Sequence, residues 1–236
     1  MIWISTPSAR NGKMIPRNRG WQFLYHRFAR SAAIAGIVVV AAVSAPFLMG
    51  PAEAETVITK SFSYFPVRGR TAADLDEALS QSGPLLQGTG IRHPGATEMR
   101  FGGTVTYADQ GTRCTVDSAR ITLDTKIILP RWTQRRRAEA DLALIWDTLS
   151  GDIKRHEERH AEIARQYARR LEGEVKDLRA QPNCEAMETE VARITESVLA
   201  EHDADQARFD RIEAINFERR MVRLLQYRLE QIKAQE

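Results

Sequence analysis

The second half of the chain predicts a helical hairpin. Larger apolar residues recur there at steps of three and four, which is the spacing of one buried helix face. The first stripe contains Leu142, Ile145, Leu149, Ile153, Ile163, Tyr167, Leu171, Val175 and Leu178. After a break at Gln181-Pro182-Asn183, a second stripe contains Met187, Val191, Ile194, Val198, Phe209 and Ile212. A short connection makes two such helices antiparallel neighbours.

Residues 55–132 predict mainly β-structure with one short helix. β-Branched and aromatic residues are concentrated in four segments, 56–60, 63–67, 98–107 and 113–129. In the last segment apolar residues alternate with polar or smaller ones, which is typical of a strand buried on one face. We expect a small N-terminal antiparallel sheet packed on the long helical hairpin of residues 137–236, which gives an α+β fold.

One short helix and one loop separate these strands. Thr71 supplies a hydroxyl N-cap and Asp74 follows three positions later, so a helix is expected to begin there. It is expected to end near Ser82-Gly83-Pro84. The segment 88–95 predicts a loop, and we expect His93 within it to be a surface residue and not a ligand.

Polar residues interrupt both helical stripes at the same level. His156 and His160 fill two places of the first stripe, and His202 and Asp205 fill places in the second. With a turn centred near residue 183, facing positions have numbers that add to about 365. On that rule His160 faces Asp205 and His156 faces Phe209, with His202 and Asp210 within about one turn. This coincidence predicts a polar site between the helices.

The motif His156-Glu157-x-x-His160 indicates a zinc hydrolase. Histidines four apart project from one helix face and can reach one ion, and Glu157 is placed to act as general base. A catalytic zinc ion takes three protein ligands and a water. The candidates for the third ligand are His202, Asp205, Asp210 and Glu213, and the sequence does not choose among them. The alternative is a pair of hydrogen-bonded structural histidines.

Residues 1–54 are interpreted as an export signal. They carry six Lys and Arg residues and one Glu, then an apolar run over 32–49 and the small-x-small sequence that ends at Ala54. The rest of the chain is slightly acidic, so the net charge of +3 comes from this leader. We expect cleavage after Ala54; an uncleaved membrane anchor is the alternative, and Met14 is an alternative start. Residues 55–236 then form a single zincin-like domain that is periplasmic or secreted.

Two further features bear on the compartment and the partners. The two cysteines, Cys114 and Cys184, form an even pair in an exported domain, which predicts a disulfide. The basic run Arg135-Arg136-Arg137 is interpreted as a solvated helix start, so no nucleic-acid partner is expected. Contact with a membrane is expected only through the leader, if it is uncleaved.

The chain resembles a family of bacterial secreted proteins, domain of unknown function 922, which is described as zinc-dependent proteases by prediction. The resemblance runs from about Tyr64 to Glu213. It is carried by the motif of His156 to His160 and by these further pieces: Tyr64-Phe65-Pro66-Val67-Arg68-Gly69, Thr71, Gly83-Pro84, Leu129-Pro130-Arg131-Trp132, Trp146, Ala164 and Cys184. Phe209-Asp210 corresponds to a Tyr-Asp pair of the family. The family's following His-Gly is absent, because Ile215-Asn216 stands there.

The resemblance implies an exported metallopeptidase that binds one Zn²⁺ per chain and cleaves a peptide or protein substrate. If the missing histidine is the family's third ligand, His202 is the substitute; if the aspartate is the ligand, Asp210 retains it. Two alternatives stay open. One is a non-catalytic helical hairpin with a structural metal, and the other is an inactive protease relative that binds an envelope partner.

Overall fold

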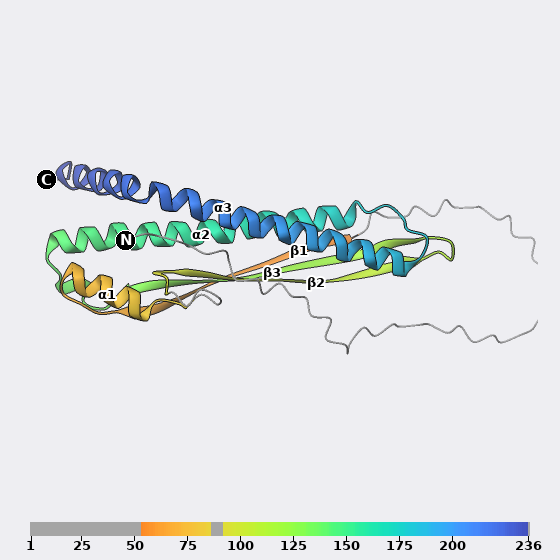
Figure 1. Cartoon of the computed structure of the whole chain (residues 1–236), viewed down its shortest axis with the longest axis horizontal. Coiled ribbons are helices and arrows are strands. Elements are labelled where there is room, and N and C mark those ends of the chain that lie inside the picture. Colours follow the sequence, from red (N-terminus) through yellow and green to blue (C-terminus); the bar gives the residue numbers. More distant parts are fainter. Residues whose placement is uncertain (1–52, 86–91, 236) are drawn as a thin grey trace, which may run out of the picture. The chain divides into compact units, whose positions relative to one another are not determined.

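A computed structural model describes residues 53–85 and 92–235 (Figure 1). The elements are β1 (Glu53–Val67), α1 (Ala72–Ser82), β2 (Ala96–Asp109), β3 (Cys114–Trp132), the 3-10 helix η1 (Arg135–Arg137), α2 (Ala140–Lys176) and α3 (Cys184–Lys233). The chain is thus α+β, with the sheet preceding the helices. The leader interpretation of residues 1–54 falls almost wholly outside the described residues, and cleavage after Ala54 stays a prediction. That boundary lies inside β1.

The sheet has three strands in the order β1-β3-β2. The pair β2 and β3 is antiparallel, as predicted, but β1 and β3 are parallel, so the prediction of an antiparallel sheet was wrong for this pair. Both β1 and β3 finish at the same end of the sheet, where Val67 pairs with Trp132. After β1, the chain passes this end through α1 and begins β2 one strand position away. That position is later filled by β3, which lies between β1 and β2. Apolar alternation predicts which face of a strand is buried, but it carries no information on strand direction.

The short helix α1 begins and ends as the sequence predicts. The Thr71 hydroxyl accepts a hydrogen bond from the Asp74 backbone N–H at 3.2 Å, and the Asp74 carboxylate accepts one from the Thr71 N–H at 3.1 Å. This capping box satisfies two N–H groups that the first turn leaves free. Leu75 and Leu79 are buried against Trp132 and Trp146, so α1 covers one end of the sheet.

The helix α2 packs on the sheet, and α3 packs along α2 (Figure 1). The helix α2 runs through Gly151 without a break. The main core lies between these layers and contains residues of all three, among them Leu123, Val175 and Val198. Two residues of the predicted stripes are exposed, contrary to the helical pattern: Ile145 at 45% and Ile212 at 51%.

A disulfide joins Cys114 at the start of β3 to Cys184 at the start of α3, as predicted. The Cα atoms are 5.0 Å apart. Beside it, Cys114 and Gln181 exchange two backbone hydrogen bonds of 2.8 and 2.9 Å, so the turn between the helices is fixed to the sheet. A disulfide of this kind is typical of an oxidising, exported compartment. Within the described ranges no helix combines the length and the apolar character needed to cross a membrane.

Removal of the disulfide is expected to destabilise the hairpin turn. The bond closes a loop with a sequence separation of 70 residues, for which the chain-entropy relation gives up to about 4 kcal/mol of free energy of unfolding. The double variant Cys114→Ala/Cys184→Ala should therefore unfold at a clearly lower urea concentration than the oxidised protein. The wild-type protein with its disulfide reduced is the matched control. Equal midpoints for oxidised and reduced protein would contradict the expectation.

Candidate metal centre

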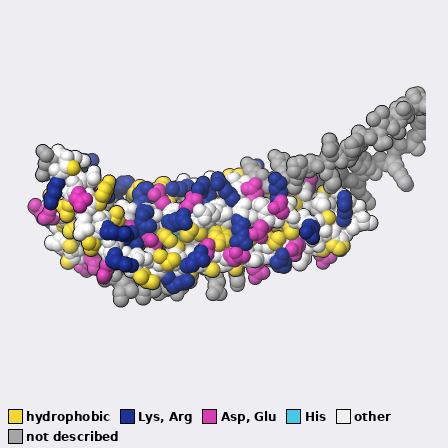
Figure 2. All heavy atoms as spheres, turned by 90° about the horizontal axis from the view of Figure 1, so that it is seen from above, with side chains coloured by type: hydrophobic (Ala, Val, Ile, Leu, Met, Phe, Trp, Pro, Cys, Tyr) yellow, Lys and Arg dark blue, Asp and Glu magenta, His cyan; other side chains and the backbone are white. Residues whose placement is uncertain are grey.

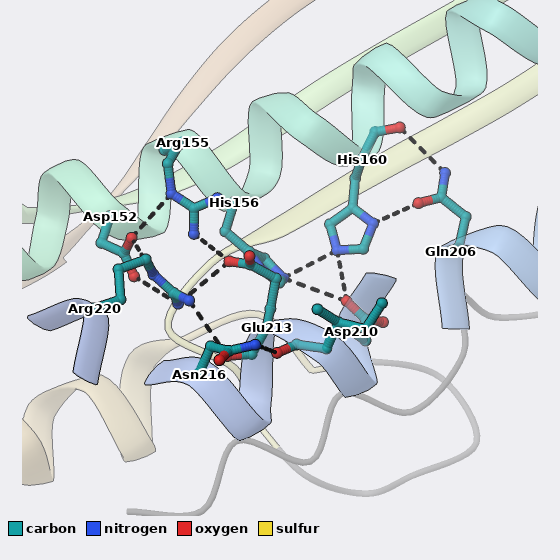
Figure 3. Close-up of polar contacts among 10 residues, drawn as sticks. Asp152, Arg155, His156, His160, Gln206, Asp210, Glu213, Asn216 and Arg220 are labelled. Atoms are coloured by element: carbon teal, nitrogen blue, oxygen red, sulfur yellow. Dashed lines mark hydrogen bonds and ion pairs between the residues drawn. The ribbon is translucent and has the colours of Figure 1, made fainter. Parts of the chain in front are cut away.

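Three donor atoms meet between α2 and α3 (Figure 3). They are Nε2 of His156, Nε2 of His160 and an oxygen of Asp210, and all three residues are buried. The two nitrogens are 3.0 Å apart. Asp210 Oδ1 lies 2.9 Å from the His160 nitrogen and 3.4 Å from the His156 nitrogen. These residues could together hold a metal ion.

The size of this triangle fits a small tetrahedral cation. For ligand bonds of 2.0–2.1 Å, tetrahedral geometry separates neighbouring donor atoms by roughly 3.3 Å. The three measured separations lie close to that value. Asp210 Oδ1 is also buried and accepts no well-directed hydrogen bond from the described residues, although both imidazoles lie near it. An unsatisfied buried carboxylate oxygen is costly unless a cation or another donor is bound there.

Helix periodicity explains how α2 brings its two donors together. The imidazoles of His156 and His160 are one turn apart on the same face, with ring centroids separated by 4.7 Å. Phe209 of α3 stacks on His156 at 5.0 Å and meets His160 edge-on at 5.1 Å. The contact between His156 and Phe209 is the one that the 365 rule predicts. The aromatic ring limits the orientation of both imidazoles, and Asp210 follows it on the next position of α3.

Gln206, on α3, orients the imidazole of His160. Its Oε1 is 2.5 Å from His160 Nδ1, and its Nε2 donates to the His160 carbonyl at 3.1 Å. With Nδ1 acting as the donor, Nε2 of His160 is left free for a metal, which is how metal-binding histidines are usually fixed. Gln206 is fully buried. Gln206 was not among the predicted site residues, although its place one turn before Asp210 on the same helix face was a usable signal in the sequence.

An ionic cluster supports the first histidine. Glu213 Oε2 lies 3.7 Å from His156 Nδ1 and also pairs with Arg155 and Arg220 (Figure 3). Arg220 in turn contacts both oxygens of the buried Asp152 at 2.9 and 3.1 Å. Burial would raise the pKa of Glu213, but the contacts with His156 and Arg155 outweigh it and lower the pKa to about 2. Glu213 therefore stays ionised beside the histidine.

The carboxylates determine the protonation of the site without a metal. Burial would lower the pKa of His156, but the contacts with Asp210 and Glu213 outweigh it and raise the pKa to about 9. Burial would raise the pKa of Asp210, but the contacts with both imidazoles lower it. A proton on His156 thus substitutes for part of the charge that a metal ion would bring.

Glu157 faces the sheet and not α3. It is 4% exposed, and the Thr97 hydroxyl lies 2.9 Å from both its Oε2 and its backbone carbonyl. Gly95 leaves the space that Glu157 occupies, because a Cβ there would lie 3.0 Å from Glu157 Oε1. Burial raises the pKa of Glu157. A carboxylate with a raised pKa is a better proton acceptor than an exposed one.

The other candidate ligands lie apart from the triangle. His202 is buried, but its Nδ1 is 3.0 Å from Asp203 and its Nε2 is 2.8 Å from Gln206 Nε2. Asp205 accepts a hydrogen bond from the Tyr167 hydroxyl at 2.7 Å, so the predicted pairing of His160 with Asp205 was wrong. The helices are rotated so that Gln206 and Asp210 face His160 instead.

His93 is buried, so the prediction of a surface residue was wrong. Its exposure is 7%, and its Nε2 has no hydrogen-bond partner among the described residues. Burial lowers the pKa of His93; the charge of Asp210 acts to raise this pKa and that of His156 to lower it, so His93 lies within electrostatic range of the centre. The sequence missed it because a loop carries no periodicity that would indicate burial.

A cavity of about 10 Å³ adjoins the donor atoms, lined by residues of α2 and α3 that include His156, Asp210 and Phe217. This volume holds about one water molecule. The space beside the donor atoms is therefore about the size of one water.

The fold and this site define an α+β protein whose helical hairpin encloses a His-His-Asp group able to hold a metal ion. Residues 62–217 match the sequence profile of the family described as bacterial protein of unknown function (DUF922). The match covers well over half of the chain, so the protein belongs to this family, as the resemblance predicted. No curated protein and no solved structure matches the chain.

Asp210 is expected to be the third ligand. Asp210→Asn should weaken zinc binding by at least about 100-fold, beyond the roughly 10- to 100-fold typical of losing a supporting residue. Asp205→Asn is the matched control, since it changes the same group on the same helix, and it should bind zinc within about threefold of wild type. Competition with a chromophoric chelator measures both. If His202→Asn weakened zinc binding more than Asp210→Asn does, the assignment would be wrong.

Zinc affinity is expected to rise with pH up to about 9. At pH 7 the His156 imidazole, with a pKa of about 9, carries a proton that zinc must displace. The apparent affinity should increase roughly tenfold per pH unit between 7 and 9 and level off above. Calorimetry in buffers of different ionisation enthalpy should report about one proton released per zinc at pH 7.5. No proton release would show that His156 is neutral before zinc binds.

Proposed function

We propose that this protein is an exported zinc-dependent metallopeptidase. The single observation that supports this most is the triangle of His156, His160 and Asp210, with a buried Glu157 next to the first histidine. Two imidazoles and one carboxylate are a ligand set of catalytic zinc sites, in which a water completes the coordination. The water-sized cavity beside His156 and Asp210 agrees with that requirement.

His156, His160 and Asp210 would hold the zinc ion. When bound, zinc lowers the pKa of its water toward about 7 and polarises a substrate carbonyl. Gln206 would keep His160 in the tautomer with a free Nε2. Glu213 would keep the ring of His156 oriented through Nδ1, while Arg155 and Arg220 hold Glu213 in place.

Glu157 would act as general base and then as general acid. It accepts a proton from the attacking water while the water oxygen forms a bond to the carbonyl carbon of the scissile peptide. It passes the same proton to the nitrogen as the C–N bond breaks, so the products are a carboxylic acid and an amine. Burial raises its pKa, which favours both transfers, and Thr97 fixes its position.

The substrate we propose is a peptide in extended conformation bound along β2. This strand is at an edge of the sheet, and its first residues pass Glu157, since Thr97 holds that side chain. An edge strand offers unpaired backbone groups to which an extended peptide can add.

The face shown in Figure 2 has Lys and Arg side chains interspersed with Asp and Glu, which does not favour a nucleic-acid partner.

A structural metal site is the second candidate, and one observation favours it. The ligands and Glu157 are each less than a tenth exposed, and the adjoining cavity of about 10 Å³ admits only a water. A structural site would be closed in this way, with the metal fastening α3 to α2. The two functions differ in what Glu157 does: a peptidase needs its carboxylate for proton transfer, whereas a structural site does not.

Glu157→Gln is expected to abolish cleavage and to keep the metal. The amide cannot accept the water's proton, so turnover should fall by about 100- to 10,000-fold, while zinc stays near one per chain. Glu158→Gln is the matched control: this neighbouring acid is partly exposed and pairs with Lys60 and Lys154. It should leave turnover unchanged. Digestion of a broad peptide library, with and without a chelator, measures cleavage, and elemental analysis measures zinc.

Two results would contradict the proposal. If zinc binds at one per chain and no peptide in the library is cut, the structural metal site is the better reading. If His156→Ala retains stoichiometric zinc, the metal is held elsewhere.

A further inference from the structure

His93 stands apart from the other buried polar side chains of the described residues. His93 is only 7% exposed, yet its Nε2 has no hydrogen-bond partner there. The only other buried side-chain atom of this kind within the described ranges is Asp210 Oδ1, a donor atom of the metal triangle. Because burial of an unsatisfied polar group destabilises a fold, each such atom calls for a specific explanation.

The backbone holds His93 in place. Its N–H donates to the Pro84 carbonyl at 3.0 Å, and Arg92 beside it donates to the Gly83 carbonyl at 2.7 Å. Gly83 packs directly on this segment, since a Cβ there would lie 2.0 Å from the His93 carbonyl oxygen. The residues on either side, Arg92 and Pro94, are not buried. The imidazole is therefore directed inward by a fixed backbone.

The segment that contains His93 runs along the metal-binding helix. Two residues further on, Gly95 touches Ile153 and Glu157 of α2, and Thr97 binds the Glu157 carboxylate. Asp210 and His156 are the charged groups that influence His93. This segment thus approaches the site from the side of the sheet. His93 does not belong to the group of three residues whose donor atoms lie within 4.8 Å of one another.

We propose that His93 is a further catalytic residue, whose Nε2–H donates a hydrogen bond to the carbonyl oxygen of the scissile peptide as negative charge develops on it. This inference rests on the proposed peptidase function. During attack, the water oxygen bonds to the carbonyl carbon, the π electrons move to the carbonyl oxygen, and Glu157 takes the proton. His93 stabilises that oxygen without giving up its own proton. When the C–N bond breaks, the electrons return and the amine takes the proton from Glu157.

A donor with no acceptor among the described residues suits this role. A preorganised donor stabilises a transition state most when it has no competing partner and no water to displace. A fourth metal ligand would instead be expected to join the triangle, and a structural histidine would be expected to have both nitrogens satisfied.

The test uses His93→Leu and His93→Gln in the full protein, loaded with Co²⁺, and acetohydroxamate as an oxyanion-bearing probe. Visible absorption follows probe binding and needs no substrate. His93→Leu should weaken the probe by about tenfold or more, while His93→Gln, which keeps an N–H donor, should recover part of the affinity. Zinc affinity should stay within about threefold of wild type in both. Tyr167→Phe removes a hydroxyl from the same helix pair, and its probe affinity should match wild type within about twofold.

The outcomes separate this inference from the proposed function. Equal probe affinity in His93→Leu and wild type overturns the role of His93, whatever the protein cleaves. A loss of zinc affinity in His93→Leu also overturns it, because His93 would then be a ligand. If the probe is weakened but wild type cuts no peptide, the His93 assignment holds and the peptidase proposal fails. With a cleaved peptide in hand, His93→Leu should lower kcat far more than it changes KM.

Discussion

The polar level buried between α2 and α3 is the constraint on which the site depends. Near the turn that joins them, the two helices pack through apolar side chains such as Val175 and Val198. At one level they meet instead through two histidines, a glutamine and an aspartate, all of them nearly inaccessible. Burial of such groups is tolerated only when each finds a partner, so this level fixes how far α3 is shifted and rotated along α2. The disulfide at Cys184 fixes the same helix from its first residue.

One turn of α2 contacts both α3 and the sheet. His156 projects toward α3, where Phe209 stacks on it, while Glu157 projects toward the sheet, where Thr97 holds it. Successive residues of a helix point about a quarter-turn apart, so adjacent motif positions necessarily face different layers. The group of three that could hold a metal ion is therefore completed by α3, and the Glu157 carboxylate is positioned by β2. A single helix packed alone could not hold both in place.

The family match covers both elements that position the site, the sheet and α3. It begins in β1 and ends at Phe217, so the sheet, the motif helix and the part of α3 that carries Asp210 and Glu213 all lie within it. The centre is thus built from the shared region of the chain. The absence of the family's His-Gly leaves the triangle intact, because the aspartate at position 210 supplies the third donor atom.

The sequence by itself determined the local order of the structure. Helical spacing predicted both long helices, the capping residues predicted α1, and two cysteines in a chain interpreted as exported predicted the disulfide. It also placed the polar residues of α2 and α3 at one level, because periodicity fixes a position along a helix to within about one turn. Tertiary structure decided the rest: the parallel pairing of β1, the meeting of the histidines with Asp210 and not with His202, and the burial of His93. Donor atoms must meet within about 3 Å, whereas one helical turn spans about 5 Å, so only the packed rotation of the helices could select among neighbouring residues.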